Sequence, residues 1–242
     1  FKDYELIISD NCSTDRTVSI IKEFLLKDHR IKLYTNKENL GEYSNRILAA
    51  SYASGKYIKY LDADDIIYPN SLSIFIDGMM AFPSAVLGIS PTTDKIKGRL
   101  PILLNCQESI RFHFLEGGIL DGGPTCTIIR KDIFDDLGGF KNERFIGDID
   151  LWFRIAENHP ILILPHSLIY YREHSGQEIA NPLAKKVYGA FSISLFEKLS
   201  FKNDLFSKHE LRVVKGNLCP SQVFRLIEKI EKLLNKLKYY FA

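Results

Sequence analysis

Cysteine is scarce in this 242-residue chain, and its few copies lie far apart. Cys12, Cys106, Cys126 and Cys219 form no Cys-x-x-Cys pair. This spacing argues against a structural zinc site and against a dense disulfide framework. We therefore expect free thiols, as in a protein of the reducing cytoplasm.

Long apolar runs and a strong net charge are also absent. No run approaches the roughly 20 residues that span a bilayer, and the first residues do not resemble a signal peptide. The formal net charge of +2 indicates neither a nucleic-acid partner nor an acidic one. With 45% hydrophobic and 26% charged residues, the composition is typical of a soluble globular protein. We expect a cytoplasmic location.

Strand-like and helix-like segments alternate over the first part of the chain. By their apolar patterns, the predicted strands are 5–9, 31–34 and 57–61, and the predicted helices are 15–26 and 44–52. Ser13 or Thr14 is expected to cap the first helix. Strands that alternate with helices through short polar connections predict an α/β domain with a largely parallel sheet.

The third predicted strand ends abruptly in Asp62, Asp64 and Asp65. Side chains alternate along a strand, so Asp62 and Asp64 are expected on one side of its end. Two carboxylates this close suit a hard divalent cation such as Mg²⁺ or Mn²⁺; the alternative is an ordinary acidic turn. Asp10 also lies at the end of a predicted strand. Because ligands bind beyond the carboxyl ends of parallel strands, the shared position of Asp10 and Asp62 favours the cation site over an ordinary turn.

The second half of the chain holds a glycine-dense loop, 117–124, which we expect to be mobile or closely approached by a ligand. Residues 148–157 have the pattern of an amphipathic helix. Within it, Trp152 is expected to pack in the core or to stack on a sugar. Arg154 is expected either to pair with a carboxylate or to be a charge on the helix face.

Six motifs occur in order between residues 4 and 178. They are Glu5–Asp15, Asn39–Gly41 followed by Asn45, Leu61–Asp65, Leu137–Phe140, Gly147–Arg154 and Tyr171–His174. In this order they resemble the family 2 inverting glycosyltransferases, nucleotide-sugar enzymes with the GT-A fold. The resemblance implies a Rossmann-like three-layer α/β/α sandwich with a mostly parallel central sheet. It implies a GT-A domain over residues 1–180 and a helical C-terminal extension over 181–242.

The resemblance also assigns roles to residues. Asp148 is implied as the base that deprotonates the acceptor hydroxyl, although it could be only a helix cap. Asp64 and His174 are implied as ligands of Mn²⁺ or Mg²⁺, with Asp62 as a third ligand or a contact to the ribose; otherwise His174 is a surface loop histidine. The implied donor-binding residues are Asp10, Asn11, Ser13, Asp15, Asn39, Asn45, Asp62, Ala63 and Arg172.

Two departures from the family pattern stand out. Phe1 lies just before the family's second strand, so the usual first strand and helix have no match, and the sheet is expected to have an open position. Either that segment is missing from this sequence, or the protein is a remnant with impaired donor binding. The second departure is Gly147, which replaces the acidic residue that usually precedes the base.

The expected activity is metal-dependent, inverting transfer of a sugar from a nucleoside diphosphate sugar to a saccharide or lipid-linked acceptor, in the synthesis of cell-surface polysaccharide or glycolipid. The alternative is a non-catalytic remnant that acts as a scaffold. A nucleotidyltransferase is less consistent, since no glycine- and basic-rich phosphate loop lies near the start.

Residues 221–241 have helical apolar spacing with five basic and two acidic residues. Such a tail can pack on the domain, dimerise, or contact the inner face of a membrane peripherally.

Overall fold

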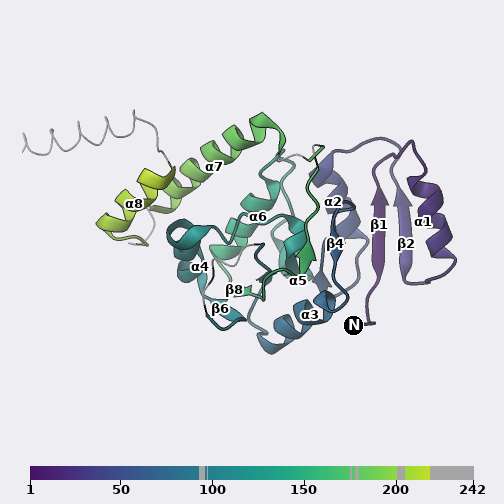
Figure 1. Ribbon diagram of the computed structural model, residues 1–242, viewed down its shortest axis with the longest axis horizontal. Helices are drawn as coiled ribbons and strands as arrows, with labels where there is room; N and C mark the ends of the chain where they lie inside the picture. The colour runs from purple at the N-terminus through teal and green to yellow at the C-terminus, as the bar shows by residue number, and fades with distance from the viewer. Residues whose placement is uncertain (93–95, 97, 175, 178–179, 201–204, 219–242) are drawn as a thin grey trace, which may run out of the picture. The chain divides into compact units, whose positions relative to one another are not determined.

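The computed structural model describes residues 1–92, 96, 98–174, 176–177, 180–200 and 205–218. The chain divides into two compact units, Phe1–Ala180 and Asn181–Ala242. Figure 1 labels the elements of both, and the larger unit contains every strand of the described residues.

The first unit begins with a small parallel sheet. β1 (Leu6–Asp10) pairs in parallel with β2 (Ile31–Thr35), and α1 (Thr17–Leu25) connects the two strands. The two strands and the helix predicted from the apolar pattern are therefore present. The other edge of β1 pairs with no strand among the described residues.

The prediction that Ser13 or Thr14 caps α1 is wrong, because the N-cap residue is Arg16 and makes no side-chain cap. Instead, the Asp15 carboxylate accepts a hydrogen bond from the Thr17 N–H at 2.9 Å. Hydrogen bonding with the Thr17 side chain, and secondly this bond from the Thr17 N–H, holds the pKa of Asp15 below its usual range. Asp15, one residue before the N-cap, thus supplies the side-chain hydrogen bond at the start of α1.

A five-stranded sheet forms the centre of the first unit. Its strand order is β3 (Tyr57–Ile58), β7 (Thr127–Arg130), β5 (Leu87–Ile89), β8 (Ile161–Ile163) and β6 (Ile102–Leu104). β5 and β8 are parallel, and the other neighbours are antiparallel. The α/β class is as predicted, and this sheet is mixed because the regular strand–helix alternation stops after the third strand.

The third predicted strand is shorter than expected. Only Tyr57 and Ile58 pair with β7, and the chain then turns, with the Asp65 N–H donating to the Asp62 carbonyl at 3.0 Å. After this turn, β4 (Ile66–Ile67) pairs in an antiparallel manner with β9 (Ile169–Tyr170). The acidic residues therefore lie in a turn between two short strands.

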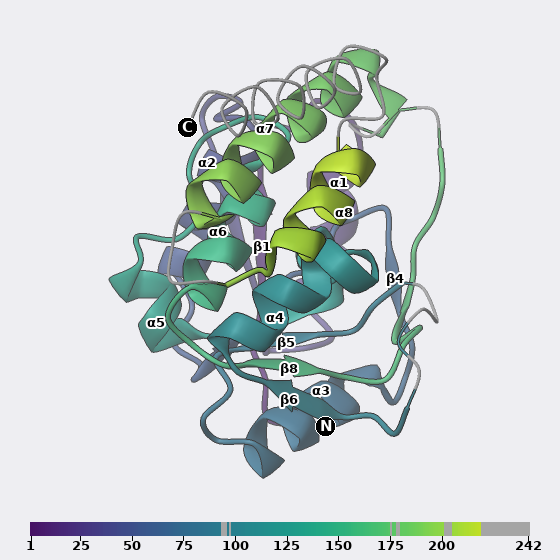
Figure 2. The same ribbon diagram turned by 90° about the vertical axis from the view of Figure 1, so that its left-hand side faces the viewer.

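Helices cover both faces of the five-stranded sheet, as Figure 2 shows, with α3 (Ser71–Ala81) on one side and α4 (Cys106–Phe112) and α6 (Gly147–Ala156) on the other. α6 is almost entirely buried. Trp152 and Phe75 are both fully buried, which supports the core-packing interpretation of Trp152. The remaining segments of this unit are α2 (Glu42–Ser51), the π-helical turn His113–Gly117, the 3-10 turn Pro124–Cys126 and α5 (Lys131–Asp136).

The second unit consists of α7 (Pro182–Ser200) and α8 (Lys208–Leu218) among the described residues. Phe196 and Phe206 stack at a tilt with ring centroids 5.3 Å apart. The predicted basic tail, 221–241, and Cys219 lie outside the described residues, whereas Cys12, Cys106 and Cys126 are free cysteines. Across the described part of the chain, no helix combines the length and apolarity that a membrane span requires.

Candidate active site

The acidic turn Asp62–Asp65 presents its carboxylates to different partners. The Asp62 N–H donates to the Thr125 hydroxyl at 3.0 Å, which ties the turn to the segment that precedes β7. Asp65 is buried and accepts a hydrogen bond from the Arg172 N–H at 3.3 Å. Burial raises the pKa of Asp65. Because it is buried and bonded to the backbone of Arg172, we interpret Asp65 as a structural residue of the turn. Asp62 and Asp64 remain as the polar surface of the turn.

Asp64 and His174 lie together although they are 110 residues apart. His174 Nε2 and Asp64 Oδ2 are 3.0 Å apart, and both side chains are exposed, at 48% and 41%. Arg172 holds the two segments together, because its side chain donates to the carbonyls of Asp64 and Ala63, the second at 3.3 Å. The structure thus brings together four of the residues implied by the resemblance, Ala63, Asp64, Arg172 and His174.

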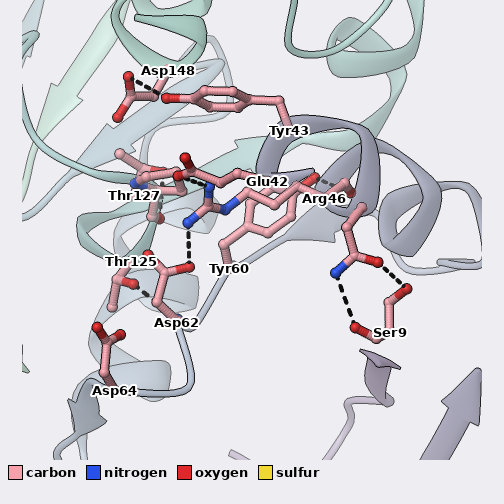
Figure 3. A network of polar contacts seen from close by, with 12 residues as sticks. Ser9, Glu42, Tyr43, Arg46, Tyr60, Asp62, Asp64, Thr125, Thr127 and Asp148 are labelled. Atoms are coloured by element: carbon pink, nitrogen blue, oxygen red, sulfur yellow. Dashed lines mark hydrogen bonds and ion pairs between the residues drawn. The ribbon is translucent and has the colours of Figure 1, made fainter. Parts of the chain in front are cut away.

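Asp62 faces a different partner, Arg46 of α2. Arg46 Nη2 lies 2.7 Å from Asp62 Oδ1, and Nη1 pairs with Glu42 one helical turn earlier. Burial lowers the pKa of Arg46, but the two carboxylates outweigh burial and raise the pKa above its usual value. Figure 3 shows Arg46 between the acidic turn and Asp148. Asp62 is therefore neutralised by a fixed cation.

Asp148 lies in the first turn of α6 and is only 6% exposed. Its Oδ1 accepts hydrogen bonds from the Tyr43 hydroxyl at 3.1 Å and from the Ile149 N–H at 2.8 Å. Burial raises the pKa of Asp148 to about 6, against the opposing effects of these two donors and of Arg46. A buried carboxyl group that titrates near neutral pH is suited to proton transfer.

The three asparagines that the resemblance implies as donor-binding residues belong to one hydrogen-bonded network, in which Asn36 is the link. Asn11 Nδ2 donates to Asn39 Oδ1 at 2.9 Å, and Asn45 Oδ1 accepts from the Ser9 hydroxyl at 2.7 Å. Asn36 connects the two groups, because its Nδ2 contacts both Asn11 Oδ1 and Asn45 Oδ1. This network fixes the loops after β1 and β2 against the start of α2.

Asp10 closes the turn after β1, where its Oδ2 accepts from the Ser13 N–H at 3.1 Å. Asp10 is buried, while Ser13 and Asp15 are exposed. Asp10, Ser13 and Asp15 therefore lie with the asparagine network at the carboxyl end of β1 and not within the Asp64–His174 pair.

Asp64 and His174 supply one oxygen and one nitrogen donor, a set that suits Mn²⁺ or Mg²⁺ when substrate phosphates complete the shell. No group of three or more histidine, cysteine, aspartate or glutamate side chains in the described ranges is arranged to hold a metal ion. The residues present thus fit a cation that is shared with a ligand, and do not fit a cation held by protein alone.

The glycine-dense loop lies beside a cavity of about 210 Å³. The cavity is lined by the end of β5 with the three residues after it, by Gly117–Ile119, by Asp121 and Gly122, and by Cys126. Trp152 Nε1 donates to the Gly122 carbonyl at 2.8 Å, which attaches the loop to α6. The side chain of Arg154 also braces α6, because its Nε lies 2.6 Å from Asp150 Oδ2; this confirms the expectation that Arg154 pairs with a carboxylate.

Tyr43, Arg46 and Lys59 were not predicted from the sequence. The spacing of Glu42 and Arg46 on a helix predicts the ion pair between them. No local pattern indicates that Arg46 also pairs with Asp62 or that Tyr43 contacts Asp148. Lys59 is half-buried and precedes the acidic turn in the sequence, and its Nζ donates to the Tyr60 carbonyl at 2.7 Å and to the Thr125 carbonyl. Burial lowers the pKa of Lys59 to about 8.

Comparison with known proteins now places the chain in a family. The family model described as Glycosyl transferase family 2 matches residues 1–138. The chain belongs to this family. A glycosyltransferase of Methanocaldococcus jannaschii is 44% identical over 214 residues, which cover 83% of this chain and 72% of that protein. The predictions of the family and of a glycosyltransferase are confirmed.

Two further relatives carry more specific names. The Escherichia coli protein WfgD, a UDP-Glc:alpha-D-GlcNAc-diphosphoundecaprenol beta-1,3-glucosyltransferase, is 40% identical over 80 residues, 33% of this chain and 31% of that protein. The crystal structure of S. aureus TarS 1–349 with UDP-GlcNAc superposes with a TM-score of 0.59 and 19% identity over 87% of this chain. This chain spans 61% of that one, and the likeness confirms the GT-A fold.

The environment of Asp148 predicts an unusual effect on stability. The pKa of Asp148 is raised in the folded state, so the folded state binds the proton more tightly, and the contribution of this group to stability falls as pH rises from about 4 to about 6. We expect Asp148→Asn to increase the free energy of unfolding at pH 8 by about 1–3 kcal/mol, and much less at pH 4. Urea unfolding at the two pH values measures the difference.

Asp132→Asn is the control for this prediction. Asp132 is exposed and pairs with Arg130, which lowers the pKa of its carboxyl, so the substitution should bring no gain at pH 8. Equal loss of stability at both pH values in Asp148→Asn would contradict the assigned environment.

Proposed function

We propose that the protein is an inverting, divalent-cation-dependent glycosyltransferase that moves a sugar from a nucleoside diphosphate sugar to an acceptor hydroxyl. The observation that carries this proposal is the buried Asp148, which lies on the opposite side of Arg46 from the acidic turn (Figure 3). In-line displacement at an anomeric carbon needs a base on one side of the sugar and stabilisation of the leaving diphosphate on the other.

Asp148 takes the role of the base. Its pKa of about 6 leaves the carboxylate mostly ionised at neutral pH and still basic enough to accept a proton from an approaching hydroxyl. Its place in the first turn of α6 favours the charged form through the helix dipole. The inverted configuration follows from a single displacement with no covalent enzyme intermediate.

Asp64 and His174 take the role of cation ligands. Asp62 lies in the same turn, but its carboxylate is paired with Arg46. A cation bound there would act as a Lewis acid for the departing diphosphate. Arg172 adds positive charge beside the same turn and is a candidate donor contact together with Ala63. Asp10, Ser13 and Asp15 are candidates to contact the nucleoside, and the Asn11, Asn39 and Asn45 network shapes the loops around it.

The comparisons support a uridine nucleotide and a lipid-linked acceptor. TarS was solved with UDP-GlcNAc and with UDP, and WfgD uses UDP-Glc and a diphosphoundecaprenol-linked sugar by its name. We therefore propose a UDP-sugar donor and a saccharide acceptor on a lipid diphosphate, in the synthesis of cell-surface polysaccharide. Such an acceptor would bring the protein to the cytoplasmic face of the membrane.

The metal role predicts a thermal shift that depends on Asp64. UDP with Mn²⁺ should raise the melting temperature of the wild type, because a ligand that binds only the folded state stabilises it. Asp64→Ala should remove most of this rise, and Asp77→Ala, at an exposed aspartate of α3, should retain it. A full rise in Asp64→Ala, measured by differential scanning fluorimetry, would rule out the cation site.

If Asp148 is the base, its substitution should reduce turnover without weakening the binding of UDP and Mn²⁺. Asp148→Asn should lower the release of UDP from UDP-GlcNAc or UDP-Glc by about 10²–10⁴-fold, the usual contribution of general base catalysis. The thermal shift with UDP and Mn²⁺ should remain as in the wild type. In the wild type the rate should fall as the pH drops through about 6. Unchanged turnover in Asp148→Asn would reject Asp148 as the base.

A further inference from the structure

Tyr43 contacts Asp148 from α2, 105 residues away in the sequence. The tyrosine is 3% exposed, and its hydroxyl lies 3.1 Å from Asp148 Oδ1. Its ring packs against Phe140, with centroids 5.5 Å apart, and the Arg46 guanidinium lies 5.6 Å from its ring centroid. The ring is therefore held in place on several sides, so the hydroxyl has a fixed position.

Gly147 provides the space that Tyr43 fills. A Cβ atom added at this glycine would lie 2.9 Å from two carbons of the Tyr43 ring and 2.6 Å from the Lys141 carbonyl oxygen. Neither distance is compatible with an unshifted neighbour. The residue before Asp148 thus has to be glycine for Tyr43 to lie where it does. Tyr43, Gly147 and Asp148 form one packed unit.

The two oxygens of Asp148 have different surroundings. Oδ1 accepts both hydrogen bonds, from Tyr43 and from Ile149. Within the described part of the chain, no donor contacts Oδ2. A carboxylate whose first oxygen is held by two donors has a fixed rotamer, and its second oxygen is then available to accept a proton.

We propose that Tyr43 is a positioning residue for the base: its hydroxyl holds Oδ1 of Asp148 and leaves Oδ2 directed to the acceptor hydroxyl. In the transfer step, Oδ2 takes the acceptor proton, the acceptor oxygen bonds to the anomeric carbon, and the bond from that carbon to the diphosphate oxygen breaks. The proposal rests on the role of Asp148 given above.

The charged groups around Asp148 set the direction of the test. Arg46 lowers the pKa of Asp148 and Glu42 raises it, and both residues lie on α2 beside Tyr43. The hydrogen bond from Tyr43 also lowers the pKa, because the carboxylate accepts it more strongly than the neutral acid does. Removal of the hydroxyl alone should therefore raise the pKa of the base and leave the two charges in place.

The test compares Tyr43→Phe with Tyr60→Phe in the full chain. Both tyrosines pack against Phe140, and the Tyr60 hydroxyl donates to the Arg46 carbonyl and not to Asp148. The rate of UDP release from UDP-GlcNAc or UDP-Glc, with Mn²⁺, is measured from pH 5 to pH 9. In Tyr43→Phe we expect kcat to fall about tenfold at pH 7 and the acid-limb midpoint to rise by about half a pH unit.

The donor KM of Tyr43→Phe should stay within about twofold of the wild type, since Tyr43 acts on the base and not on the donor. Tyr60→Phe should keep the wild-type midpoint. An unshifted midpoint in Tyr43→Phe would overturn the proposal, as would an equal shift in Tyr60→Phe.

A second measurement does not depend on turnover. The midpoint of the Asp148 carboxyl is followed by NMR titration in the wild type and in Tyr43→Phe, and it should rise in the variant; no rise overturns the proposal. Asp148→Asn separates the two hypotheses. If that variant is inactive and Tyr43→Phe titrates as the wild type does, only the role of Tyr43 fails. If Asp148→Asn is fully active, the proposed base itself fails.

Discussion

The ion pair between Arg46 and Asp62 is the contact on which the rest of the candidate site depends. It joins α2 to the acidic turn, and the Glu42 carboxylate on the same helix satisfies the other side of the guanidinium. A poorly exposed cation would be costly without both partners. Tyr43 lies on the same helix and contacts Asp148. One helix therefore contacts both the acidic turn and the proposed base.

Burial separates the chemistry of the two principal carboxylates. Asp148 is buried at the start of α6 beside Tyr43, and this burial raises its pKa to about 6. Asp64 is 41% exposed beside His174, where it can share a cation with an incoming ligand. Paired carboxylates whose environments differ in this way can act in different roles within one reaction. The two environments support the proposed roles, proton transfer for Asp148 and diphosphate stabilisation for Asp64.

Much of the fold could be predicted from local patterns. β1, α1 and β2 follow from their apolar spacing, and the family follows from six motifs in order. The predicted cap of α1 and the predicted length of the third strand were wrong. In both places neighbouring residues have similar propensities, so the local pattern does not decide which residue makes the capping bond or where the strand ends. Asp15 takes the capping bond, and the strand ends at Ile58 because the chain turns to reach β4.

The motifs led to the prediction of Asp64, His174 and Asp148 as site residues, because metal binding and proton transfer need these residue types, and the structure brings Asp64 and His174 within 3.0 Å of each other. Tertiary structure alone decided that Arg46 neutralises Asp62 and that Tyr43 holds Asp148. The physical reason is that both contacts join segments far apart in the sequence. Their strength comes from burial, which is a property of the packed fold and is not contained in any short stretch of residues.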